Sequence, residues 1–328
     1  MYSHYTLLQI LSLITKGGGG SNTPPEQTLP PGYTQEQYDT LVNTIMDNTD
    51  LTKEQTQRIL TNVLNKNTTL EEVDENTLIF KENNKAFHYN DPEDHETQIK
   101  FDMETLKLMV NGKGNYTIEE AMDAYYSVPE MNRALCDKLC FDDEYHGPGG
   151  CYNLRTHEIH INKDLLTDTE AQFKSADIYH TMFHEMGHAL DGTLNNHYNS
   201  ANAGNQFQRI MRYTGEKGST YSELYNPKTS PYTIRDRDTH YAETIAEMVA
   251  VTRCARKFGG NNAYIEDPKV KIDPNTDYRG HDITYNQWKK ENPTLAKFAN
   301  KLIDCKNTYD IYLLFGDDDI MPFNPNLE

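Results

Sequence analysis

The chain has 328 residues, and its 31 lysines and arginines against 50 aspartates and glutamates give a formal net charge of −19. This balance argues against a nucleic-acid-binding protein and an anionic membrane surface, because both partners require a basic footprint. No run approaches the roughly 18 consecutive apolar residues that a membrane span requires, so a membrane-spanning helix is not expected. Reduced thiols are expected for the five cysteines, although one disulfide among Cys136, Cys140 and Cys151 is an alternative.

The N-terminal segment has the composition of an added peptide. Gly17 to Ser21 reads GGGGS, a flexible linker of the engineered kind, so residues 1–21 are expected to be an engineered peptide plus linker. We interpret residues 2–16, which are rich in Leu and Ile, as a tethered segment of a substrate, inhibitor or partner. A cloning tag is the alternative. Residues 22–33 contain four prolines and are expected to be an extended lead-in.

Helical spacing of apolar residues follows the lead-in. It predicts helices over 34–47 and 52–64, a short strand over 77–81 and a helix over 101–109. Residues 34–128 are therefore expected to form a mainly helical N-terminal region, which could recruit substrate, target the protein or brace the rest. From about residue 129 the chain is richer in His and Tyr, and residues 129–328 are expected to form the second domain.

A metal-ligand motif lies in the stretch YHTMFHEMGHAL. His184, Glu185 and His188 form an H-E-x-x-H pattern, and apolar neighbours at helical spacing predict a helix around it. Residues four apart lie on one helix face, so both imidazoles can reach a single Zn²⁺ with Glu185 beside them. A buried helix with two ordinary histidines is the alternative. His180 is not expected to be a ligand, because a fourth protein ligand would displace the catalytic water.

The third zinc ligand must come from elsewhere in the chain. The metzincin continuation is absent, because Asp191 and Leu194 occupy the positions that would need Gly and His. A second predicted helix, entered near Asp238, presents Glu243 and Glu247 four residues apart on a largely apolar face. Buried carboxylates are costly unless they are paired or metal-bound. We assign Glu243 to the zinc, and Glu247 to a ligand histidine that it orients. Asp191 is expected to support a ligand or to cap its helix.

The pairing of HEMGHALD with YAETIAEMVA resembles the zinc peptidase family of anthrax lethal factor and the bacterial Pro-Pro endopeptidases. The resemblance covers roughly residue 159 to the C-terminus. It implies an α+β, predominantly helical fold, with a zincin-type catalytic domain whose small sheet covers the motif helix. It also implies Glu185 as general base and a tyrosine near the substrate carbonyl, for which Tyr232 is preferred and Tyr241 is the alternative.

Thr156 to Asn162 (THEIHIN) alternates polar residues with Ile159 and Ile161, which predicts a strand. In peptidases of the resembled family, a strand before the motif helix pairs with the extended substrate. His157, Ile159 and Ile161 are accordingly expected to bind substrate. The resemblance also implies a protein that is secreted or delivered into other cells.

The sequence thus predicts a zinc endopeptidase, of toxin or effector type, acting on a protein or peptide substrate. Three alternatives stay open: a zinc hydrolase of non-peptide amides, a degenerate protease-fold module that binds without cutting, and an unrelated helical protein with an accidental motif.

Overall fold

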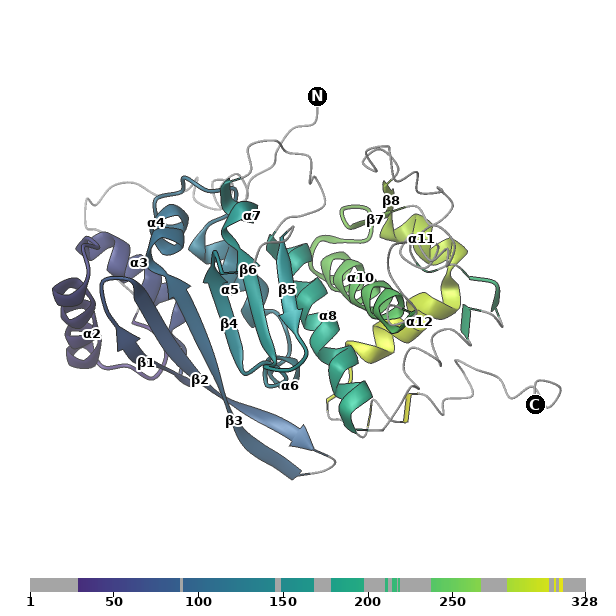
Figure 1. The fold of residues 1–328 in the computed structure, drawn as a ribbon, viewed down its shortest axis with the longest axis horizontal. Helices are drawn as coiled ribbons and strands as arrows, with labels where there is room; N and C mark the ends of the chain where they lie inside the picture. Colours follow the sequence, from purple (N-terminus) through teal and green to yellow (C-terminus); the bar gives the residue numbers. More distant parts are fainter. Residues whose placement is uncertain are drawn as a thin grey trace, which may run out of the picture.

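The structure is a computed structural model that describes residues 29–88, 91–144, 149–167, 178–197, 210–211, 214–216, 218, 237–266, 282–306, 310 and 313–314. The predicted N-terminal peptide, its linker, most of the proline-rich lead-in and Tyr232 lie outside the described residues. Within them the fold is mixed α/β, with a six-stranded sheet that has helices at both of its ends (Figure 1).

Two capped helices open the described fold. Thr34 and Thr52 each form a capping box, with Gln37 and Gln55, and start helices close to the predicted ranges: α2 (Gln35–Asn48) and α3 (Lys53–Val63). Their apolar faces are buried in the core. Three consecutive antiparallel strands follow: β1 (Thr68–Val73), β2 (Thr77–His88) and β3 (Asp91–Asp102).

Residues 34–128 were expected to be mainly helical, and they combine helices with three strands. Strands β2 and β3 have 12 residues each, and their far ends project from the sheet as a long hairpin (Figure 1). Only the first part of β2 was predicted, because residues 81–96 are mostly polar and show no apolar alternation. Backbone pairing in register from Thr77↔Asp102 to His88↔Asp91 forms the hairpin instead.

The sheet continues through the expected domain boundary near residue 129. Parallel pairing joins β3 to β4 and β4 to β6, while β5 pairs antiparallel with β6. The strand order is β1-β2-β3-β4-β6-β5, so one sheet spans both predicted regions and is larger than the small sheet expected. The elements of this part are α4 (Met103–Val110), α5 (Ile118–Tyr126), α6 (Glu130–Arg133), β4 (Lys138–Asp142), β5 (Gly150–Asn153), β6 (Glu158–Asn162) and α7 (Lys163–Thr167).

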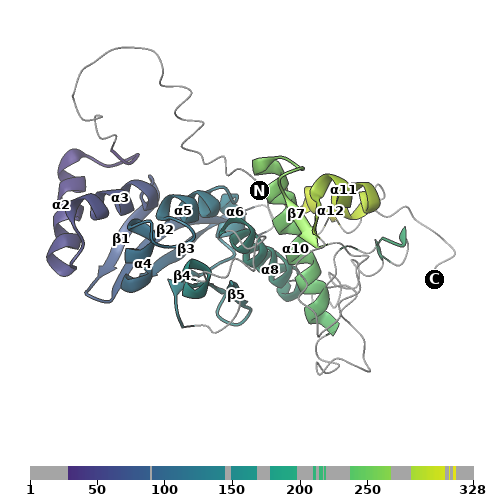
Figure 2. The same ribbon diagram turned by 90° about the horizontal axis from the view of Figure 1, so that it is seen from above.

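Two long helices lie beside the free end of the sheet. Helix α8 packs against β5, α5 and α10, and α12 packs on α10 (Figures 1 and 2). The remaining elements are α8 (Ile178–His197), α10 (Arg237–Phe258), β7 (Tyr264–Glu266), β8 (Asp282–Thr284), α11 (Tyr285–Glu291) and α12 (Pro293–Leu302). The predicted motif helix and glutamate helix are therefore confirmed as helices. No helix in the described part of the chain is long and apolar enough to cross a membrane.

A buried ion pair joins the sheet to the helices. Glu82 on β2 is fully buried, and its carboxylate accepts hydrogen bonds from Arg133 Nη2 at 2.9 Å and from Tyr125 Oη at 2.7 Å. The Arg133 guanidinium also lies over the rings of Tyr125 and Tyr126. Removing the arginine would leave a buried carboxylate without its counter-charge.

We expect Arg133→Met to lower the free energy of unfolding by roughly 3–5 kcal/mol, the usual cost of breaking a buried ion pair from one side. Urea unfolding followed by circular dichroism measures this change. The matched control is Lys85→Met, which removes the exposed pair with Asp94 and should cost less than about 1 kcal/mol. Equal costs for the two variants would contradict the importance of the buried pair.

Candidate metal centre

Helices α8 and α10 approach each other closely at Gly187. A Cβ built on Gly187 would lie 2.6 Å from the Cα of Ala246 and 3.2 Å from the Cβ of Val249, so only glycine permits this packing. Gly187 lies between Glu185 and His188, and Ala246 lies between Glu243 and Glu247. The close approach therefore brings the histidines of one helix to the glutamates of the other.

Three side chains from these helices converge on one point. His184 Nε2 lies 3.1 Å from Glu243 Oε2, and His188 Nε2 lies 3.4 Å from the same oxygen. The two Nε2 atoms are 3.1 Å apart. His184, His188 and Glu243 thus form a group that could hold a metal ion, as the sequence predicted.

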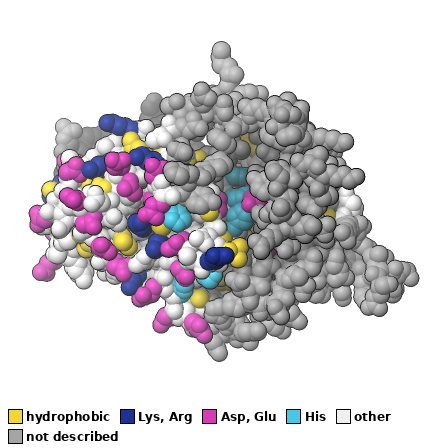
Figure 3. All heavy atoms as spheres, viewed as in Figure 1, with side chains coloured by type: hydrophobic (Ala, Val, Ile, Leu, Met, Phe, Trp, Pro, Cys, Tyr) yellow, Lys and Arg dark blue, Asp and Glu magenta, His cyan; other side chains and the backbone are white. Residues whose placement is uncertain are grey.

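The dimensions of this triangle fit a tetrahedral ion. Zn–N and Zn–O bonds are about 2.0–2.1 Å long, which places neighbouring ligand atoms of a tetrahedron about 3.3 Å apart. The observed separations of 3.1 to 3.4 Å match this edge length. Glu243 keeps 32% of its side chain exposed, against 14–15% for the two histidines, so the group is open on the glutamate side. Histidine side chains gather near the centre of the face shown in Figure 3.

Glu247 contacts the ring of His184 at Nδ1, the nitrogen that does not face Glu243. Its Oε2 lies 3.3 Å from His184 Nδ1 and 2.9 Å from His180 Nε2. A carboxylate at Nδ1 fixes the tautomer that leaves Nε2 free for a metal. Burial by itself would lower the pKa of His184, but its hydrogen bonds to Glu243 and Glu247 raise that pKa to about 10.

A second group, overlapping the first, also has the composition of a metal site. His180, His184 and Glu247 could hold an ion too, and the sequence reasoning missed the His180–Glu247 pair. Its signal was the position of His180, one helical turn before His184. We favour the group with His188, because Glu247 exposes only 8% of its side chain while Glu243 exposes 32%. An ion held by His184, His188 and Glu243 would be accessible to water and substrate.

Glu185 lies next to the two histidines on α8 and faces β5 of the sheet. A Cβ built on Gly150 of β5 would come within 3.0 Å of Glu185 Cγ, so this glycine makes room for the carboxyl. Burial raises the pKa of Glu185, and the neighbouring His184 and His188 only partly oppose the rise. Its Oε2 is buried without a hydrogen-bond partner. A carboxylate in this state is a stronger base than a solvated one.

The strand expected to bind substrate is not at the edge of the sheet. Strand β6 pairs with β4 on one side and β5 on the other, and Ile159 and Ile161 are fully buried. The assignment of these two side chains to substrate binding was therefore wrong. His157 precedes β6 with φ of 52°, and its Nδ1 lies 3.5 Å from a carboxylate oxygen of Asp137. The alternating pattern marked a strand, but it could not show which strand ends the sheet.

The remaining predicted site residues are placed only in part. Tyr232 lies outside the described residues, and Tyr241 lies in α10 with a side chain outside the description. Asp191 is buried on α8, one turn beyond His188, and its supporting role stays a prediction. None of the five cysteines forms a disulfide, in agreement with the expectation of reduced thiols.

Comparisons with known proteins do not indicate a function for this chain. Comparison of the chain with models of protein families, with curated proteins and with solved structures gave no match. The function must therefore be argued from the arrangement of the side chains described above.

We expect Gly187→Ala to disrupt the metal group. The new methyl would clash with the backbone of Ala246, which no side-chain rotation can relieve, and forced overpacking usually costs about 1–3 kcal/mol. The helices must separate, which moves Glu243 away from the histidines. The midpoint temperature of thermal unfolding should decrease, and so should the amount of bound zinc, which atomic emission measures. A variant with unchanged zinc content would show that the close helix packing does not set the site.

Proposed function

We propose that the protein is a zinc-dependent endopeptidase with a zincin-type catalytic domain, similar to the family of anthrax lethal factor and the Pro-Pro endopeptidases. The observation that carries the proposal is the convergence of His184 Nε2, His188 Nε2 and Glu243 Oε2 at tetrahedral spacing. Three protein ligands with an exposed side are typical of catalytic zinc, whereas structural zinc has four.

Each part of the site has a role in peptide hydrolysis. His184, His188 and Glu243 would hold the ion, which would supply a water of lowered pKa, toward about 7, and would polarise a carbonyl. Glu185 takes a proton from the attacking water and returns it to the leaving amine. Its burial against Gly150 supports this role, because the carboxylate is poorly solvated.

Strand β5 is the element best suited to hold the substrate. It ends the described sheet and packs against α8, so an extended peptide added to its outer edge would run beside the catalytic helix. Main-chain pairing of this kind binds peptides without fixing their side chains. We therefore propose that β5, and not β6, binds the substrate backbone.

Either Tyr232 or Tyr241 is proposed as the donor to the developing oxyanion. Secretion or delivery into other cells is proposed from the resemblance alone.

The test is digestion of a proteome-derived peptide library, followed by sequencing of the fragments by mass spectrometry. We expect new termini with wild-type protein and zinc, none after chelation, and their return when zinc is restored. Cleavage that persists without metal would contradict the proposal. Hydrolysis of small amides without any peptide cleavage would instead favour a non-peptide zinc hydrolase.

A further inference from the structure

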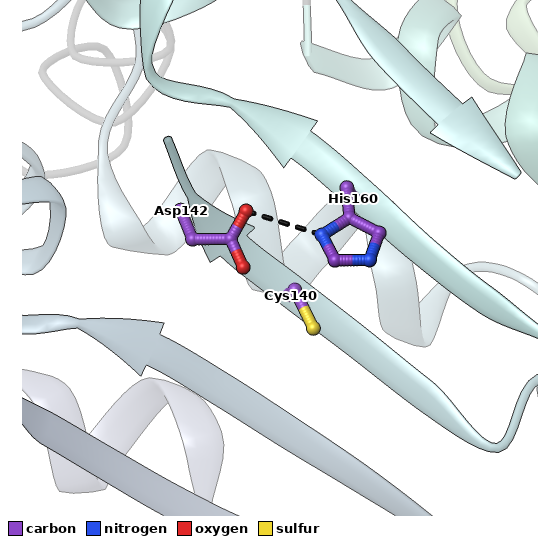
Figure 4. Close-up of side chains that lie close together, drawn as sticks. All are labelled: Cys140, Asp142 and His160. Atoms are coloured by element: carbon purple, nitrogen blue, oxygen red, sulfur yellow. Dashed lines mark hydrogen bonds and ion pairs between the residues drawn. The ribbon is translucent and has the colours of Figure 1, made fainter. Parts of the chain in front are cut away.

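A second cluster of metal-binding side chains lies on the face of the sheet opposite to α8. Leu139, Phe141 and Ile159 point into the core from β4 and β6, so the alternate residues of these strands point the other way. These alternate residues include Cys140 and Asp142 on β4 and His160 on β6, shown in Figure 4. Their ligand atoms all lie within 4.8 Å of one another.

The strand register brings these side chains together. Cys140 is paired with His160 across β4 and β6, and Asp142 follows Cys140 on the same face. His160 Nδ1 lies 3.1 Å from Asp142 Oδ1. On its other side, His160 is paired with Cys151 of β5, so Cys151 lies on the same face. A row of Cys, His and Cys across three neighbouring strands is thus combined with a carboxylate.

An unsatisfied carboxylate oxygen points to a missing ligand. Asp142 is 2% exposed, and its Oδ2 is buried without a hydrogen-bond partner. Such an atom is costly unless something binds it. The two neighbouring lysines do not bind it, because Lys100 pairs with Glu144 and Lys138 pairs with Glu158, each at 3.0 Å. A divalent cation held by a thiolate, a carboxylate and a neutral imidazole would leave the cluster without net charge.

A disulfide does not account for the cluster. Cys140 and Cys151 lie on strands separated by β6, which places their Cα atoms about 9–10 Å apart at the usual strand spacing. A disulfide requires less than about 7 Å. The mixture of sulfur, nitrogen and oxygen ligands instead suits zinc or a similar transition-metal ion.

We propose that Cys140, Asp142 and His160 form a second zinc-binding site. Binding displaces the proton of the Cys140 thiol to solvent, and modest side-chain rotation shortens the separations to those of a tetrahedral site. The ion would join β4 to β6.

Cobalt is the probe that separates the two sites. Among the candidate groups in the described residues, only the sheet site includes a cysteine as a ligand, so it is the one expected to give the near-ultraviolet thiolate-to-cobalt charge-transfer band. We expect the metal-free full chain to develop this band on titration with Co²⁺ and to bind two ions. Cys140→Ser should lose the band and one ion, and Asp142→Asn should weaken the binding that produces the band. The control Cys305→Ser, which changes a buried thiol near the end of α12, should behave as wild type.

His184→Ala separates this proposal from the proposed peptidase function. It removes the residue shared by both candidate groups on α8 and α10, so the variant should retain the cobalt–thiolate band and bind one ion. Zinc should raise its midpoint of thermal unfolding, and the double variant His184→Ala/Cys140→Ser should show no such rise. The sheet site is contradicted if wild type gives no thiolate band at saturating cobalt, or if Cys140→Ser keeps the band.

Discussion

Glu185→Gln is expected to abolish most peptide hydrolysis while the fold and the bound zinc are retained. A positioned general acid–base group contributes about 10²–10⁴-fold to the rate, so kcat/KM should fall by that factor, or about 3–5 kcal/mol of transition-state stabilisation. Glutamine has nearly the shape of glutamate and fills the same space between Gly150 and α8. It cannot accept the proton of the attacking water.

The kinetic experiment needs a control carboxylate and a measurement of metal content. Glu96→Gln removes an exposed charge, paired with Lys81, far from the proposed chemistry, and should leave kcat/KM unchanged. Zinc content of Glu185→Gln should equal that of wild type, because Glu185 is not among the converging ligand atoms. Wild-type turnover by the Glu185 variant would exclude it as the base. If the variant lost its zinc, the fall in activity would report the loss of the metal and not the loss of the base.

Local sequence signals predicted the helices well. Thr34 and Thr52 with glutamines three residues later start α2 and α3 within one residue of the predicted positions, because a capping box is complete within a few residues. The β2–β3 hairpin was not predictable in the same way. Its projecting end is polar, and its stability comes from backbone pairing between residues up to 25 positions apart, such as Thr77 with Asp102.

The metal group was predictable to the extent that helix geometry fixes it. His184 and His188 share a face by their spacing alone, and Glu243 and Glu247 share another. The contact between the two helices depends on tertiary packing at Gly187 and Ala246, for which the sequence offered only the small residues. The edge position of β5 and the cluster around His160 depend on strand order and register, which no local pattern in this chain encodes.

The two overlapping groups on α8 and α10 make opposite predictions for two histidine variants. If the ion lies between His184, His188 and Glu243, then His188→Ala removes a ligand and should abolish both zinc binding and cleavage. His180→Ala removes a partner of Glu247 and leaves these three ligands in place. It should weaken zinc affinity by about 10–100-fold at most, the usual effect of losing a residue that orients a ligand.

Competition with a chromophoric chelator, in a Cys140→Ser background that removes the proposed sheet site, measures both affinities. Glu247→Gln should resemble His180→Ala, because its role at His184 Nδ1 is to orient the ring, whereas Glu243→Gln should resemble His188→Ala. The reverse order would place the ion between His180, His184 and Glu247. In that position its carboxylate ligand would be the more buried of the two, and Glu243 would no longer be a ligand. The open coordination position on which the hydrolytic mechanism depends would then lose its structural basis.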